Sequence, residues 1–218
     1  MTDAAVIEVR DMAIVHRTFR AAYDESARLV RAETDPTPDR VTFLADHIDL
    51  GLLLMHHHHE SEDALLWPKL LERAPQEAAT VQRVADQHLS VASAVERAGK
   101  ANDAWRRTPE TPQRDELADS LLALNVALQE HLDDEETLVV PLAAKTLTQE
   151  EWNAIGAHSR AGIPKDKMFV AFGMLLEPLS DNDRRYMLSE VPPPVKVLWR
   201  LLGQRSWRKY AARLRPAS

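Results

Sequence analysis

The chain contains no cysteine among its 218 residues. This absence excludes disulfide frameworks, cysteine-bound zinc, iron–sulfur clusters and thiol nucleophiles, so histidines and carboxylates must provide any metal or acid–base chemistry. Glycine is also scarce, with six residues, and only three tyrosines and four phenylalanines accompany long stretches rich in Ala, Leu, Glu and Arg. This composition argues against an all-β sandwich and favours an all-α protein.

Long hydrophobic runs are missing as well. No window approaches roughly 18 uninterrupted apolar residues, the length that a membrane-spanning helix needs. Residues 1–11 lack the apolar core of a signal peptide. With 44% hydrophobic residues the chain can still bury a core. We therefore expect a soluble, cytoplasmic protein with no transmembrane segment.

Acidic residues are nearly absent from the C-terminal end. The whole chain has a net charge of −7, but residues 184–218 contain nine Lys or Arg and one Glu, a local charge of +8. Residues 1–183 therefore carry −15, the difference between these two values. The chain combines an acidic part with a basic one.

Prolines divide the first 143 residues into four long segments, and each proline lies where it can begin a helix. The spacing predicts helices at 4–33, 38–67, 75–99 and 112–144, with Gly99 ending the third. Thr148 and Glu151 form a capping-box pattern that predicts a fifth, shorter helix.

Each long segment carries a seam of apolar residues spaced three and four apart, which lines one face of a packed helix, and each seam has a histidine near its middle. The first two seams comprise Val9, Met12, His16, Phe19, Tyr23 and Val30, then Leu44, Ile48, Gly51, Met55, His58, Glu62 and Leu65. The last two comprise Val81, Val84, His88, Val91 and Val95, then Leu121, Leu124, Leu128, His131, Glu135, Leu138 and Leu142.

The segments form an internal two-helix repeat. The offset is 72 residues for one matched pair and 73 for the others, namely His16/His88, His58/His131, Glu62/Glu135 and Pro68/Pro141. The distances between seam histidines suit a helix, a turn and a returning helix, so the four imidazoles should meet at one level of an antiparallel bundle.

Four buried imidazoles and two buried carboxylates would be costly unless a metal coordinated them. A His and a Glu four residues apart project from one face of a helix, so each His-x3-Glu motif can bind one metal while its carboxylate reaches a second. The expected donor set suits a pair of iron or manganese ions, with zinc as a substitute. It comprises His16, His58, Glu62, His88, His131 and Glu135.

Four phrases of the sequence resemble the hemerythrin-like (HHE cation-binding) family across residues 10–143. They begin at His16, His58, Gln87 and His131, and the second reads HHESEDALLWP. The resemblance implies an up-down-up-down four-helix bundle with a non-haem di-iron centre bridged by an oxo or hydroxo group. By position, it implies ligand roles for the same six residues. We therefore expect this bundle over residues 1–145 and a helical, basic extension packed on it over 146–218.

The chain departs from the oxygen-carrying members of that family. Those have a second histidine one turn from the first in the third helix, whereas the positions four residues either side of His88 are Val84 and Ala92. They also have an Asp five residues after the fourth-helix histidine, where this chain has Glu135 at four. Either the metal pair is more open than in the carriers, or another residue completes it. The candidates are Tyr23, His57 and His59, and for the two histidines a solvated face of the helix is the favoured alternative.

Asp63 and Glu136 directly follow the two seam carboxylates. Metal-bound imidazoles usually donate their second ring N–H to a partner, and these two residues are candidates for that role. The alternative is simple exposure on the helix surface. His158, beyond the bundle, is expected to be structural or exposed.

The C-terminal part contains three further patterns. Residues 168–176 predict a short buried helix, and Pro192 to Pro194 a rigid spacer. Residues 195–214 predict a basic amphipathic helix with Val195, Leu198, Trp199, Leu202 and Tyr210 on one side. We expect this helix to pack across the acidic bundle; binding to an anionic membrane surface or to nucleic acid is the alternative. No recognisable nucleic-acid fold is present, so no nucleic-acid partner is expected.

These observations predict a non-haem di-iron protein that binds or transforms dioxygen, hydrogen peroxide or nitric oxide. The sequence leaves open whether it is an enzyme that consumes peroxide or nitric oxide. The alternative is a non-enzymatic iron or oxygen sensor, or an iron-handling protein, that signals through its C-terminal extension. A purely structural bundle would have to bury six ionisable groups without a metal.

Overall fold

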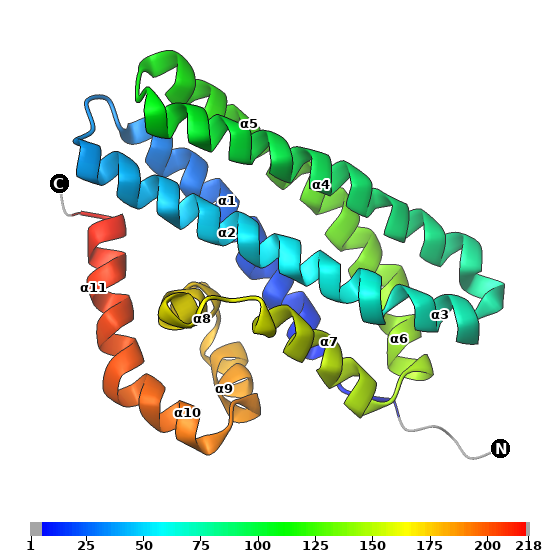
Figure 1. The fold of residues 1–218 in the computed structure, drawn as a ribbon. Coiled ribbons are helices and arrows are strands. Elements are labelled where there is room, and N and C mark those ends of the chain that lie inside the picture. The colour runs from blue at the N-terminus through cyan, green and yellow to red at the C-terminus, as the bar shows by residue number, and fades with distance from the viewer. Residues whose placement is uncertain (1–5, 217–218) are drawn as a thin grey trace.

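A computed structural model describes residues 6–216, and all regular elements within that range are helical (Figure 1). The all-α prediction is confirmed. Four long helices form the main body: α1 (Arg10–Ala32), α2 (Pro38–Leu65), α4 (Ala78–Arg107) and α5 (Thr111–Asp134). Helices α1 and α4 each pack against both α2 and α5, so helices that are consecutive along the chain are neighbours in space. This is the predicted up-down-up-down bundle.

Local signals set most helix ends. Thr37 caps α2 by accepting a hydrogen bond from the Arg40 amide, and Pro38 occupies the first turn. The first helix begins at Arg10 rather than near residue 4; residues 4 and 5 lie outside the described part. The prediction that Gly99 ends the third helix is wrong, because α4 continues to Arg107. A helical glycine costs only about 1 kcal/mol, and the buried residues beyond it, Trp105 among them, offset that cost.

The matched prolines of the repeat both distort their helices, since proline lacks an N–H and its ring clashes with the carbonyl four residues earlier. Near Pro68, α2 ends and the short α3 (Trp67–Arg73) begins. Before Pro141, α5 passes through a π-helical turn, η2 (Glu135–Val139), into α6 (Val140–Thr146). The wider turn shifts the inward face by one residue, so Leu138 is 40% exposed and Val139 is fully buried. The prediction that Leu138 continues the seam is wrong for this reason.

Two apolar clusters fill the bundle, one on each side of the level where the seam histidines lie. The first cluster includes Phe19, Met55, Val91 and Leu128. The second contains residues one to two turns away on the other side, namely Met12, Leu66, Val84 and Val139. The seam histidines therefore lie between two water-excluding layers.

The remaining helices follow the bundle. Helix α7 (Gln149–Ala161) begins with the predicted capping box, in which Thr148 and Glu151 bond reciprocally, and it packs along α2. Helices α8 (Met168–Leu176), α9 (Asp181–Glu190), α10 (Pro193–Leu198) and α11 (Gln204–Leu214) lie on one side of the bundle (Figure 1). The short turns η1 (Pro75–Glu77) and η3 (Lys165–Lys167) precede α4 and α8, and a π-helical turn, η4 (Trp199–Gly203), joins α10 to α11.

The extension differs from expectation in two ways. The three prolines are not a spacer, because Pro193 begins α10. The predicted apolar side of the last helix is right for Trp199, which is buried, and for Tyr210, which packs against the core. It is wrong for Val195, Leu198 and Leu202, which are exposed. Trp207 and Leu214 are buried in their place. The π-helical turn and the docking of both tryptophans on α8 decide which side faces inward. None of the described helices has the length and apolar character needed to cross a membrane.

Candidate metal centre

The structure brings all six predicted donor residues together in the middle of the bundle, where each is buried. Their donor atoms fall into two groups, and within each group all atoms lie within 4.8 Å of one another. One group comprises His16, His58, Glu62 and Glu135, and the other comprises His59, Glu62, His88 and His131. All four long helices contribute.

Both carboxylates lie between imidazoles of different helices. Oε1 of Glu62 lies 3.2 Å from Nε2 of His58, and Oε2 lies 3.4 Å from Nε2 of His88. Oε2 of Glu135 lies 3.4 Å from Nε2 of His16 and 3.6 Å from Nε2 of His131. Each carboxylate can therefore reach toward both halves of the cluster, as a bridging ligand does.

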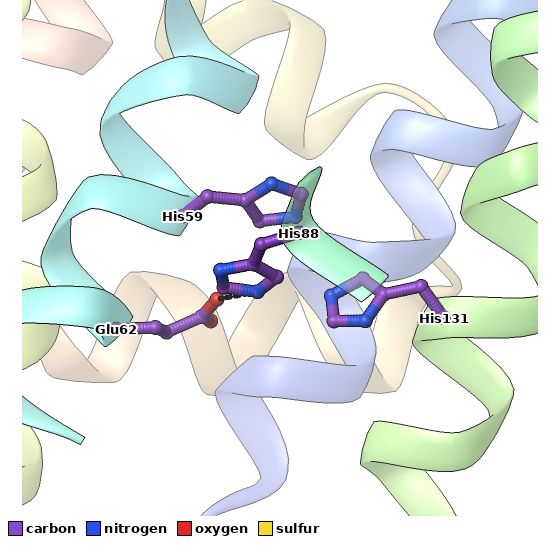
Figure 2. Close-up of side chains that lie close together, drawn as sticks. All are labelled: His59, Glu62, His88 and His131. Carbon is purple, nitrogen blue, oxygen red and sulfur yellow. Dashed lines mark ion pairs between the residues drawn. The ribbon is translucent and has the colours of Figure 1, made fainter. Parts of the chain in front are cut away.

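His59 is the buried member that the seam pattern did not include. Figure 2 shows its ring beside that of His88, with Glu62 and His131 around them. The rings of His59 and His88 are stacked with centroids 4.0 Å apart, and the ring of His131 stands edge-on at 5.0 Å from that of His59. The expectation of a solvated face for His59 is wrong, because α2 has neighbours on both sides. Adjacent residues can thus face α1 and α4 respectively.

The other candidates for an additional donor lie elsewhere. The Tyr23 hydroxyl donates a hydrogen bond to the Gly51 carbonyl at 2.9 Å, inside the apolar cluster. His57 points away from the cluster: its ring lies against Gly162 at the end of α7, and it is bonded to Glu60, forming with His56 a separate group of three donor residues nearer the surface. His158 is exposed, as expected.

Polar residues outside the cluster hold three of the imidazoles. Nδ1 of His16 lies 3.0 Å from Glu136, and Nδ1 of His88 lies 2.8 Å from Asp63. Nδ1 of His131 lies 3.4 Å from the side-chain oxygen of Gln87. Because carboxylate and amide oxygens only accept, each Nδ1 carries the proton and each Nε2 presents its lone pair to the centre. Asp63 and Glu136 are therefore imidazole partners, the first of the two roles considered for them.

Burial sets the charge state of the cluster in the absence of a metal. It lowers the pKa of His58 and His59, with neighbouring imidazoles adding to the shift, and lowers the pKa of His131 to about 3. Burial raises the pKa of Glu62, and it raises that of Glu135 to about 8 with help from the nearby Glu62. These imidazoles are therefore neutral, as metal ligands must be, while the carboxyls lack the cation that would stabilise their charge.

The unsatisfied atoms fit a metal. Buried polar atoms normally have hydrogen-bond partners. Seven side-chain atoms of the cluster have none: Nε2 of His59, His88 and His131, and both oxygens of Glu62 and Glu135. They are unpaired lone-pair donors facing one another, and a bound cation would satisfy them together.

Comparison with known proteins agrees with this site. A family model described as the hemerythrin HHE cation binding domain matches residues 8–143, which include every donor residue named above. No curated protein and no solved structure matches the chain.

Proposed function

This chain belongs to the hemerythrin HHE cation binding domain family, whose members bind metal, and we propose that its buried cluster holds a pair of iron ions. Manganese or zinc are the substitutes. The observation that carries the proposal is the set of seven unpaired buried lone-pair donors at one level of the bundle. The proposed ligands are the six residues predicted from the sequence together with the additional imidazole of His59.

The donor set has unequal halves. One half supplies three imidazoles, from His59, His88 and His131, whereas the other supplies two, from His16 and His58. Both halves share the two carboxylates. The half with two nitrogens leaves more coordination positions free, so we propose that a small molecule is admitted there.

We propose that the small molecule is an oxidant, namely dioxygen, hydrogen peroxide or nitric oxide. When bound, the iron pair supplies two electrons and an open Lewis-acidic position. The protein's own residues orient the imidazole ligands and shield the site from bulk water. Glu136, Asp63 and Gln87 hold the imidazoles with Nε2 inward, and the apolar layers around Phe19 and Val84 keep bulk water out.

Metal analysis tests the binding step. Protein from iron-replete cells, washed with EDTA to strip the surface group around His57, should contain two irons per chain. His58→Ala combined with His131→Ala should lose them, whereas His158→Ala, at an exposed position, should retain both. Fewer than one metal per wild-type chain, or unchanged content in the double variant, would contradict the proposal. The near-ultraviolet bands of an oxo-bridged iron pair, and their response to peroxide, nitric oxide and dithionite, then identify the oxidant.

A second candidate function, an iron or oxygen sensor, is favoured by the packing of the extension on ligand-bearing helices. Ile14, two residues before His16, shares an apolar cluster with Met174 and Trp199. On α2, Nδ1 of His47 lies 3.0 Å from the hydroxyl of Tyr210 on α11. Loss of metal would then loosen the extension. Limited proteolysis of metal-free and metal-loaded protein near residues 144–165 should differ under this proposal, and identical digestion would count against it.

A further inference from the structure

An exposed apolar surface lies on α10 and η4. It comprises Val195, Val197, Leu198, Leu201 and Leu202, and we call it the C-terminal apolar face. In the described part of the chain ten large hydrophobic residues are exposed, and these five fall within eight consecutive positions. Leu201 is 70% exposed and Leu202 is 56% exposed. Such clustering differs from the single exposed side chains that are normal on a protein surface.

The extension already uses the opposite side of this segment for its own core. Trp199 packs edge-on against Phe172 of α8, with ring centroids 4.8 Å apart. The Trp207 ring covers Gly173, where any Cβ atom would lie 2.2 Å from the indole. Because these contacts determine the rotation of the segment, the C-terminal apolar face cannot turn inward without breaking them. Figure 1 shows α10 on the side of the extension away from the four long helices.

The same segment is strongly basic. Residues 191–216 contain seven Lys or Arg and no Asp or Glu. The last two of these are engaged with other helices: Arg213 lies over the Phe43 ring, and Arg215 pairs with Glu25 and Glu177. By contrast, Lys196, Arg200 and Arg205, around the C-terminal apolar face, form no ion pair with a carboxylate of the described residues.

We propose that the C-terminal apolar face is a peripheral anchor for an anionic lipid bilayer. The leucines and valines enter the boundary between headgroups and acyl chains, while the lysine and arginine side chains reach the lipid phosphates. The charge distribution sets the orientation. Residues 1–183, at −15, are repelled by the anionic surface, and the C-terminal segment, at +8, is attracted to it. The metal cluster then stays in the aqueous phase.

Charge favours lipid over the other partners for this face. In a symmetric contact between two copies, Lys196 and Arg200 of both chains would meet, and residues 184–218 of each chain offer a single carboxylate, Glu190, to pair with them. A nucleic acid would bind the basic side chains but would leave the valines and leucines in water. An anionic bilayer satisfies both the charge and the apolar surface.

Vesicle co-sedimentation of the full chain tests the proposal. The wild-type protein should pellet with vesicles of phosphatidylcholine and phosphatidylglycerol, more weakly with phosphatidylcholine alone, and more weakly again at high salt. Leu201→Asp combined with Leu202→Asp should lower the partition coefficient about tenfold or more, because two buried leucines are lost. Leu89→Asp is the matched control, since Leu89 is a 75% exposed leucine on α4, and it should bind like the wild type.

A second variant separates the contribution of charge from that of the apolar residues, and a mass measurement separates lipid binding from dimer formation. Lys196→Gln with Arg200→Gln leaves the apolar residues in place and should remove most of the preference for anionic vesicles. Helix content by circular dichroism should be unchanged in all variants. No binding to anionic vesicles at low salt would overturn the proposal, as would equal binding by the Leu201/Leu202 variant. A dimer in light scattering that this variant converts to a monomer, or duplex DNA binding without vesicle binding, would overturn it as well.

Discussion

Removal of the metal should make the bundle sensitive to pH above 6.5, because it leaves the carboxyls of Glu62 and Glu135 buried without a cation. Burial raises the pKa of Glu135 from 4.5 to about 8 in the metal-free fold. The unfolded chain binds fewer protons at this residue than the folded chain between those two values. The free energy of unfolding therefore falls as pH rises through this window and levels off above the folded pKa.

The buried histidines also change the pH dependence of the free energy of unfolding, but only below pH 6.5. Burial lowers the pKa of His131 from 6.5 to about 3, so its effect runs the other way: it adds stability as pH rises, and this gain is complete near pH 6.5. From pH 6.5 to 8 the carboxyls dominate. At 1.36 kcal/mol per pKa unit, Glu135 alone should lower the free energy of unfolding by about 2 kcal/mol over this interval.

Urea denaturation of chelator-treated protein at several pH values measures this effect. In Glu135→Gln, the fall in the free energy of unfolding between pH 6.5 and 8 should be about 2 kcal/mol smaller than in the wild type. The double variant with Glu62→Gln should lose most of the pH dependence that remains. Glu130→Gln, an exposed carboxyl on the same helix, is the control and should leave it unchanged. Metal-loaded wild type should show little dependence, because the cation stabilises both carboxylates. A flat profile for the metal-free wild type would refute this account of the buried charges.

Three further predictions concern single positions. His59→Leu should lower the metal content of EDTA-washed protein below two per chain, whereas the surface variant His57→Leu should not change it; elemental analysis distinguishes them. Glu136→Gln should weaken metal binding about 10- to 100-fold in a chelator competition, because the partner of one imidazole is weakened. Gly173→Ala should destabilise the protein by about 1–3 kcal/mol in urea denaturation, since the tryptophan ring above it must move, whereas Gly156→Ala meets only a flexible arginine and should be neutral or stabilising.

The repeat of histidines and carboxylates shows which features of the site can be predicted from residue spacing along one helix. Seam positions in a regular helix share one face, so the burial of His16, His58, His88 and His131 could be predicted from spacing alone. Their common level followed from the helix lengths. The same reasoning could not identify His59, which points about 100° away from its neighbour in a helix. The available signal was the shortage of one imidazole donor beside a run of histidines.

The C-terminal segment shows the opposite case. Its composition predicted a basic amphipathic helix, but three of the five residues on the predicted apolar side are exposed. The docking of Trp199 and Trp207 on α8 sets the rotation of the segment, and the π-helical turn at Trp199–Gly203 shifts the register of the residues that follow it. A similar turn at Glu135–Val139 displaced Leu138 from the seam. A turn of this kind changes every later position of a helix by about one residue, and periodicity assumes that no such change occurs.

Spacing and composition alone predicted the helices, the level of the seam histidines, the two carboxylates between them and the division into acidic and basic parts. These properties depend on spacing along a single helix or on composition, both of which are local. Three features could be seen only in the packed helices: His59 joins the cluster, Asp63 and Glu136 orient imidazoles, and the valines and leucines of α10 and η4 face outward. Each of these depends on which helix lies beside another and at what rotation, and packing sets that relation.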